Sequence, residues 1–172
     1  MTLATVIRTQ PLTRFADAAR AHEETLLRAF LVSPWILVRE EQEFPPFARL
    51  LETVRVSKAR LTVLTRPPDK ASHLQAVNLI SEIPHSEIFY LDSLHAKLYL
   101  LECNAFRIAM IGSPNFTPEG DTLHRELAVE IRSARESDVA GLLVRDLFAF
   151  SLDLMSDETA RVHKRLVLGN RC

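Results

Sequence analysis

A histidine and a lysine stand two residues apart at the start of an apolar run that is typical of a β-strand. They are His95 and Lys97, and side chains two residues apart on a strand project from the same face of a sheet. The end of the next such run carries a second polar pair, Ser113 and Asn115, with the same spacing. If the two runs pair as a hairpin, the four side chains meet at one end of the sheet.

These four side chains would form a receptor for an anion with a nucleophile beside it. Lysine, serine and asparagine all donate hydrogen bonds that suit the nonbridging oxygens of a phosphodiester. A neutral imidazole can attack phosphorus when a carboxylate holds the proton on its other nitrogen. Glu126, just before the apolar run 127–131, is the candidate for this carboxylate. Glu130 is the rival, but it lies deeper in that run, where we expect an ion-paired or solvent-facing role.

Three further residues are candidates for contacting the substrate. Arg66 and Lys70 follow an apolar run, in a loop of the kind that binds ligands in open α/β sheets, and either contact phosphates or are solvated. Gly112 precedes the serine and would supply backbone angles that other residues rarely adopt. The aromatic residues Trp35 and Tyr99 could stack on a base, but their apolar neighbours favour a place in the core.

The elements that must position these residues follow from the spacing of apolar side chains. Helical spacing predicts helices over 12–30, from Pro45 and Pro46 to about 54, over 74–80, and from about Glu136 to Ser156. Short β-prone runs predict strands at 30–36, 61–65, 87–91, 97–101, 106–111 and 127–131. The early strand–helix alternation predicts parallel pairing, and the short link at 102–105 predicts a hairpin that adds antiparallel strands. The fold class is therefore α/β, with a mixed sheet.

Composition places the chain among ordinary globular proteins. With 172 residues, 47% hydrophobic and 25% charged, it suits a single domain over 1–172, with a core at about 12–155 and a tail at 157–172 that forms a basic helical turn or frays. The net charge of −1 indicates no overall electrostatic attraction to an anionic partner. Two cysteines outside any metal-binding pattern predict neither a disulfide framework nor zinc. No run suggests a signal or a membrane span, so we expect a cytoplasmic protein.

Taken in order, the polar residues resemble a known signature. His95-Ala96-Lys97, then Gly112-Ser113-Pro114-Asn115, then Glu126 are similar to the HxK…GSxN…E pattern of the phospholipase D superfamily. Most of residues 12 to 155 looks like the compact domains of this type found in bacterial nucleases. The resemblance implies a mixed sheet flanked by helices on both faces, a phosphohistidine intermediate, and catalysis with no metal and no other cofactor.

Two departures from the family pattern concern the hairpin. Glu102 stands where the family has an aspartate five residues after the lysine, and the spacing from there to the Gly-Ser pair is three residues longer. The family's aspartate is regarded as structural, so we expect these changes to alter local hydrogen bonding or the rim of the site.

The number of motifs bears on assembly. A superfamily active site needs two such motifs, one for the nucleophile and one for the acid, and this chain has one. A twofold homodimer that places two His95 side chains against each other would supply both.

The sequence therefore predicts a homodimeric, metal-independent phosphodiesterase, most simply a nuclease, acting on DNA in preference to RNA and not at a membrane. One alternative is a phospholipase or phosphatidyl transferase. Another is an inactive nucleic-acid-binding or assembly module, with a helicase or a restriction-type protein as its partner.

Overall fold

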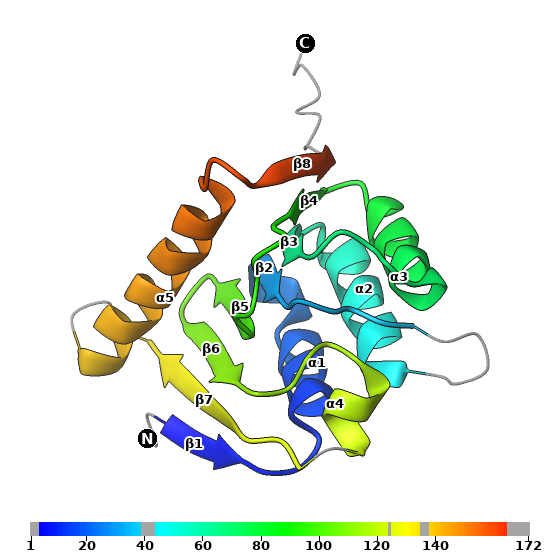
Figure 1. Cartoon of the computed structure of the whole chain (residues 1–172). Coiled ribbons are helices and arrows are strands. Elements are labelled where there is room, and N and C mark those ends of the chain that lie inside the picture. The colour runs from blue at the N-terminus through cyan, green and yellow to red at the C-terminus, as the bar shows by residue number, and fades with distance from the viewer. Residues whose placement is uncertain (1–3, 39–43, 124, 135–137, 165–172) are drawn as a thin grey trace.

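An eight-stranded mixed sheet runs through the computed structural model, which describes residues 4–38, 44–123, 125–134 and 138–164 (Figure 1). The strands are β1 (Ala4–Ile7), β2 (Leu26–Val32), β3 (Arg60–Thr65), β4 (Ser86–Tyr90), β5 (Leu98–Cys103), β6 (Arg107–Gly112), β7 (Ala128–Ser133) and β8 (Arg161–Lys164). The helices are α1 (Pro11–Ala21), α2 (Pro45–Ser57), α3 (Ala71–Ser81), α4 (Pro118–Thr122) and α5 (Val139–Met155), with a 3-10 turn, η1 (Glu23–Thr25), after α1.

The centre of the sheet has the predicted parallel pairing. The strand order is β1-β7-β6-β5-β2-β3-β4-β8, in which β3 is parallel to both β2 and β4, and α2 and α3 form the crossovers. The predicted hairpin is present as β5 and β6, and β5 pairs antiparallel with β2. The α/β class with a mixed sheet is therefore confirmed.

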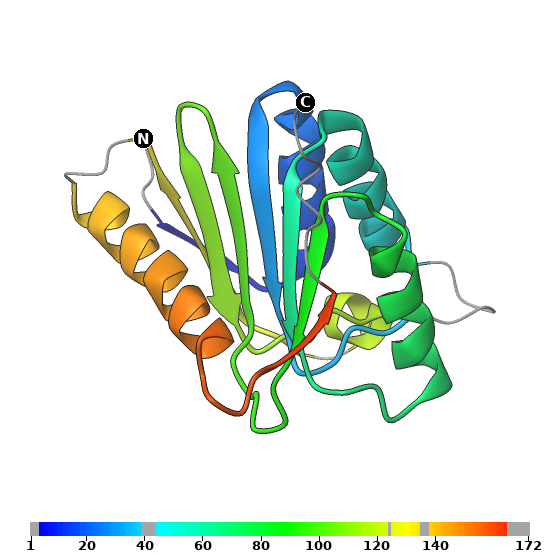
Figure 2. The ribbon, with the colours of Figure 1, turned by 90° about the horizontal axis from the view of Figure 1, so that it is seen from above.

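Helices cover both faces of the sheet, as Figure 2 shows: α1, α2 and α3 lie on one face and α5 on the other. Each face has its own apolar core, because alternate residues of a strand point to opposite sides. Leu31 and Leu101 belong to the core beneath α1 and α2, whereas Phe30 and Leu100 belong to the core that also contains Val144 of α5.

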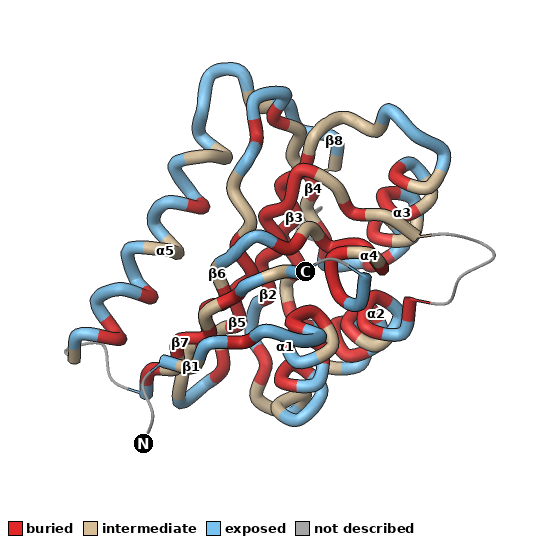
Figure 3. The backbone as a smooth tube through the Cα atoms, turned by 60° about the horizontal axis from the view of Figure 1, so that its bottom comes forward, coloured by how far each residue is buried: buried red, intermediate tan, exposed pale blue. Residues whose placement is uncertain are grey.

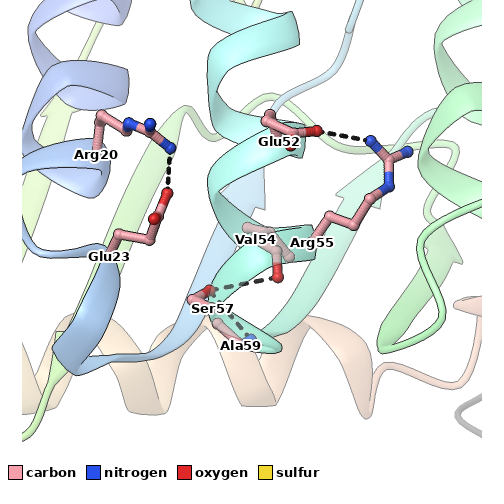
Figure 4. A network of polar contacts seen from close by, with 7 residues as sticks. All are labelled: Arg20, Glu23, Glu52, Val54, Arg55, Ser57 and Ala59. Carbon is pink, nitrogen blue, oxygen red and sulfur yellow. Dashed lines mark hydrogen bonds and ion pairs between the residues drawn. The ribbon is translucent and has the colours of Figure 1, made fainter.

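Pairs of charged side chains lie at the helix ends that lead into β2 and β3 (Figure 4). Arg20 pairs with Glu23, and Arg55 pairs with Glu52 at 3.0 Å. The hydroxyl of Ser57 donates to the carbonyl of Val54 and accepts from the backbone N–H of Ala59. These two hydrogen bonds close the end of α2. Exposed ion pairs of this kind add little to stability.

The prediction of a first helix over residues 12–30 is wrong beyond Ala21. The helix ends there, η1 follows, and Leu26 and Phe30 lie in β2, which ends at Val32 before the predicted limit of 36. Leu26 and Phe30 are four residues apart and both buried, a spacing that also suits a helix face. A bulge between Leu26 and Arg28 breaks the strand's alternation, and so it hides the strand from a search for period two.

Three short elements went unpredicted. The edge strand β1 pairs with β7, and β8 pairs with β4, so that the sheet extends past residues 12–155 at both ends. The expected basic turn or fraying after residue 157 is therefore wrong for Arg161–Lys164; residues 165–172 lie outside the described part. Helix α4 has only five residues, and the hydroxyl of Thr117 accepts from the N–H of Gly120 to cap it.

Candidate active site

One edge of the sheet collects all the loops that carry the predicted site residues. β2 ends there at Val32, opposite Leu98 at the start of β5, and β6 ends there at Gly112, opposite Ala128 at the start of β7. The loops before β5 and β7 and after β3 and β6 therefore meet at this edge. These loops hold His95 and Lys97, Glu126, Arg66 and Lys70, and Ser113 and Asn115.

The two halves of the HxK…GSxN pattern are linked through Lys97. Its Nζ donates a hydrogen bond to the backbone carbonyl of His95 at 3.1 Å, and its own carbonyl accepts from the N–H of Gly112 at 3.4 Å. His95 is exposed and Lys97 is half-buried. Both side chains are thus placed at the mouth of the site and not in the core.

Ser113 and Glu126 hold the other side of the site together. The hydroxyl of Ser113 donates to Oε2 of Glu126 and accepts from the N–H of Leu127 at 3.1 Å. The N–H of Ser113 also donates to the carbonyl of Leu127 at 3.0 Å. Among the described hydrogen bonds, Glu126 therefore supports Ser113, while its predicted support of His95 stays a prediction.

Gly112 is required because another strand passes close to it, and not because of its backbone angles. No described glycine has a positive φ, so the expectation of unusual backbone angles at Gly112 is wrong. A Cβ at this position would lie 2.2 Å from the carbonyl oxygen of Leu127 and 2.7 Å from Cα of Ala128. Glycine is needed because β7 passes so close to it.

The loop that carries Asn115 rests on buried side chains. The hydroxyl of Tyr99 donates to the carbonyl of Pro114 at 2.6 Å, and Ser33 accepts from the N–H of Phe116 at 3.1 Å. Tyr99 is fully buried, and this burial raises the pKa of its phenol. Tyr99 therefore belongs to the core beneath the site, and Oδ1 of Asn115 is buried without a hydrogen-bond partner among the described residues.

Arg66 contacts the imidazole directly, and no local pattern in the sequence predicts this contact. Its Nη2 lies 2.8 Å from Nε2 of His95, and its Nε donates to the carbonyl of Leu94 at 2.9 Å. The guanidinium also lies over the ring of Trp35, 5.0 Å from the ring centroid. Trp35 is half-buried beside the site, whereas Lys70 is exposed at the start of α3.

The loop after β3, which carries Arg66, is held by buried side chains at its base. Thr65, the last residue of β3, donates its hydroxyl to the carbonyl of Pro34 at 3.2 Å and lies 3.0 Å from Nε2 of His73. Burial lowers the pKa of His73, although the charge of Asp69 opposes the shift. His73 is thus a neutral core side chain that fixes the base of the loop.

Glu130 and Glu102 form ion pairs with arginines. Glu130 is 2% exposed and pairs with Arg14 and Arg132, so its predicted ion-paired role is confirmed and the solvent-facing one is wrong. Glu102 pairs with Arg28 and Arg107. Five residues along the strand place Glu102 roughly 16 Å from Lys97, at the opposite edge of the sheet.

Two open hollows adjoin the site. One has Arg8, Arg125 and Glu126 in its wall. The other lies between the sheet and α5, where Lys97 and Gly112 meet the apolar side chains of Leu127, Leu147 and Phe150. The site therefore borders a polar surface on one side and an apolar surface on the other.

In the part of the chain that the structure describes, no three His, Cys, Asp or Glu side chains are grouped to hold a metal ion, and no helix is long and apolar enough to cross a bilayer.

Solved structures share this architecture. No protein-family model and no curated protein sequence matches the chain. Nuc from Salmonella typhimurium, a phospholipase D family member, aligns over 94% of this chain and 99% of its own, with a TM-score of 0.66 and 12% identity. NucT from Helicobacter pylori aligns over 89% and 95%, with a TM-score of 0.63 and 8% identity.

A larger protein contains the same fold as a part. Polyphosphate kinase from Porphyromonas gingivalis aligns over 90% of this chain but only 26% of the kinase, with a TM-score of 0.67 and 13% identity. At these identities the comparisons concern the fold alone. The chain has the phospholipase D fold, as the resemblance of its motifs implied.

Proposed function

We propose that this protein is a metal-independent phosphodiesterase that cleaves nucleic acid through a covalent bond between His95 and phosphorus. The observation that carries the proposal is the convergence of His95, Lys97, Ser113, Asn115 and Glu126 on one edge of the sheet. A nucleophilic ring, a cation and two neutral hydrogen-bonding groups at one place suit a phosphodiester, because charge builds on the phosphoryl oxygens during attack. The shared fold with a phospholipase D family member supports the assignment.

The proposed reaction has two steps at phosphorus. Nε2 of His95 attacks, an N–P bond forms, and the P–O bond to the leaving alkoxide breaks as that oxygen takes a proton from a second imidazole. The ring of His95 keeps its Nδ1 proton. Water then attacks phosphorus, gives its proton to the second imidazole, and the N–P bond breaks. The ammonium of Lys97 stabilises the negative charge that develops in both steps.

We assign the second imidazole to the partner's His95 in a homodimer. The apolar hollow beside Lys97 supports an interface there, since Leu127 and Phe150 are 52% and 43% exposed. Along α5, Leu142, Leu143 and Leu152 are exposed as well, and Figure 3 shows how few positions of this helix are buried. Apolar side chains exposed next to an incomplete site are typical of a surface that another copy covers.

Nucleic acid is the substrate that the charges around the site favour. Arg66 stands at one side of His95, and the exposed Arg8 and Arg125 line the hollow beside Glu126. Arginines on both sides of the reacting phosphate can contact the neighbouring phosphates of a strand. A local arrangement of this kind requires no net positive charge on the chain.

A panel of substrates tests the proposal. Purified protein is incubated with single- and double-stranded DNA, with RNA and with a phosphatidylcholine analogue, each with and without EDTA, beside the His95→Ala variant. We expect cleavage of nucleic acid that persists in EDTA and is lost in the variant. Cleavage that needs added magnesium would remove the mechanism, and cleavage of the lipid analogue alone would move the protein to the phospholipase class. Nucleic acid retained without products, equally by both proteins, would indicate a binding module.

A further inference from the structure

Arg66 differs from the other cations of the site in how firmly it is held. Its guanidinium has three contacts, with the carbonyl of Leu94, the ring of Trp35 and the ring of His95. The stacking contact and the Leu94 contact do not involve the reacting groups. They fix the plane of the guanidinium before any substrate arrives, so little side-chain entropy is lost on binding.

The contact with His95 fixes the position of the imidazole proton. Arginine stays protonated and has only donors, so at 2.8 Å its Nη2 must donate and Nε2 of His95 must accept. A neutral ring whose Nε2 accepts carries its proton on Nδ1. This is the tautomer whose Nε2 lone pair is available for attack on phosphorus.

The same guanidinium is placed to receive the phosphate. When phosphorus approaches Nε2, its nonbridging oxygens come into the space that Nη2 now faces. The Nη1 group has no hydrogen-bond partner among the described residues, so two nitrogens of a planar fork can turn to the phosphoryl oxygens while Nε stays on Leu94.

Resting on the function proposed above, we propose that Arg66 is a catalytic residue: it holds His95 in the attacking tautomer in the free protein and passes its Nη2 donor to the phosphoryl oxygens when the substrate binds. Glu126, whose described contact is with Ser113, is not needed for this step. The proposal also assigns Trp35 a part, as the platform that keeps the guanidinium in place.

Phosphate binding tests the second half of the proposal without any turnover. Inorganic phosphate is titrated calorimetrically into the wild-type protein, Arg66→Gln and the control Arg55→Gln, whose exposed side chain lies on α2. We expect Arg66→Gln to bind phosphate about ten- to a hundredfold more weakly and the control to be unchanged. Trp35 is the only tryptophan, so its fluorescence should also change on binding in the wild type and the control. Equal affinities in all three proteins would overturn the proposal.

Nitrogen-15 NMR of labelled histidine tests the first half. At a pH at which the ring is neutral, we expect Nε2 of His95 to be unprotonated and Nδ1 protonated in the wild type, with the resonance assigned by its absence in His95→Ala. In Arg66→Gln we expect a mixture of tautomers. The same single tautomer in both proteins would show that another group holds the ring, and the proposal would be wrong.

Chemical rescue separates this proposal from the proposed function. Arg66→Ala is assayed with a small phosphodiester, with guanidinium added far below denaturing concentrations, and with urea, which is planar but uncharged. We expect partial recovery with guanidinium only. Equal recovery with urea, or none with either, would contradict a direct role for the charge. If the wild-type protein cleaves no diester, the proposed function fails, while the binding and NMR results still decide the role of Arg66.

Discussion

The two glutamates near the site differ in what surrounds them. Glu126 is half-buried and accepts from Ser113 at the edge where the predicted site residues meet. Glu130 is buried among backbone and side chains and is held by Arg14 and Arg132. Burial alone would raise the pKa of Glu130, but the hydrogen bonds and charges of the two arginines outweigh it and lower the pKa below its ordinary value. Glu130 therefore stabilises the fold, whereas Glu126 lies at the edge where the proposed reaction would take place.

Replacement of each glutamate by glutamine should separate these roles. We expect Glu126→Gln to lower kcat by up to about a hundredfold, because Ser113 loses the carboxylate that positions it, with the free energy of unfolding changed by less than about 0.5 kcal/mol. Glu130→Gln should cost about 2 kcal/mol of stability, because it leaves two arginines without their partner, while folded molecules keep their activity. Urea unfolding and steady-state kinetics on both variants measure this. The opposite pattern would assign the catalytic carboxylate to Glu130.

The acid dependence of stability should differ as well. The pKa of Glu130 is lowered in the folded protein, so its contribution is present above the ordinary value of 4.5 and is lost as the pH falls from there through the folded pKa. We expect the stability difference between the wild type and Glu130→Gln to shrink in that range. A constant difference from pH 7 to pH 3 would show that ionisation of Glu130 does not stabilise the fold.

The candidate site depends on how closely β6 and β7 approach each other. Gly112 ends β6 where the carbonyl of Leu127 passes, and the N–H and hydroxyl of Ser113 bond to Leu127 next to it. The close approach places the serine against Glu126. The packing of the strand ends and the placement of the site's polar groups therefore depend on the same contacts.

Gly112→Ala should disturb both at once. The added Cβ would meet backbone atoms at 2.2 and 2.7 Å, which cannot move aside as a flexible side chain can. We expect a loss of about 1–3 kcal/mol in the free energy of unfolding, and a lower kcat at temperatures where the variant is fully folded. Thermal unfolding and kinetics below the transition check this. A variant with wild-type stability and activity would show that the strands separate freely.

The sequence predicted most elements because their signals are local. The parallel strands and their crossovers, and the hairpin, follow from apolar runs and short links, and the order of His95, Lys97, Ser113 and Asn115 along them indicated the edge where they meet. The contact of Arg66 with His95 depends instead on a loop after β3 and a loop before β5, 29 residues apart. The strand β8 depends on its pairing with β4, and the bulge in β2 hid that strand's beginning. Such contacts are set by packing across the sheet, which no single window of sequence contains.

The proposed reaction requires two copies of the chain. Each chain carries one HxK motif, and the apolar surface of α5 adjoins that motif through Lys97, Leu127 and Phe150. A charge in this surface should separate the copies, because an ionised carboxylate is costly to bury without a partner. We expect light scattering of the wild type to give about twice the chain mass of 19.5 kDa.

Phe150→Asp should be a folded monomer with at least tenfold lower turnover, since it lacks the partner's His95. Leu74→Asp is the matched control, because Leu74 is 50% exposed on α3, on the other face of the sheet. It should remain dimeric and active. A monomer that turns over substrate at the wild-type rate would contradict the shared site.

The proposed covalent bond between Nε2 of His95 and phosphorus can be trapped. An end-labelled oligonucleotide is mixed with the protein in EDTA, quenched in alkali within the first turnover, and resolved on a denaturing gel, with peptide mass spectrometry to locate the label. We expect a labelled protein band in the wild type that is stable to base, labile to acid and attached at His95, and no such band in His95→Ala. Product formation by the wild type in a single turnover, with no protein-bound label at any time, would contradict it.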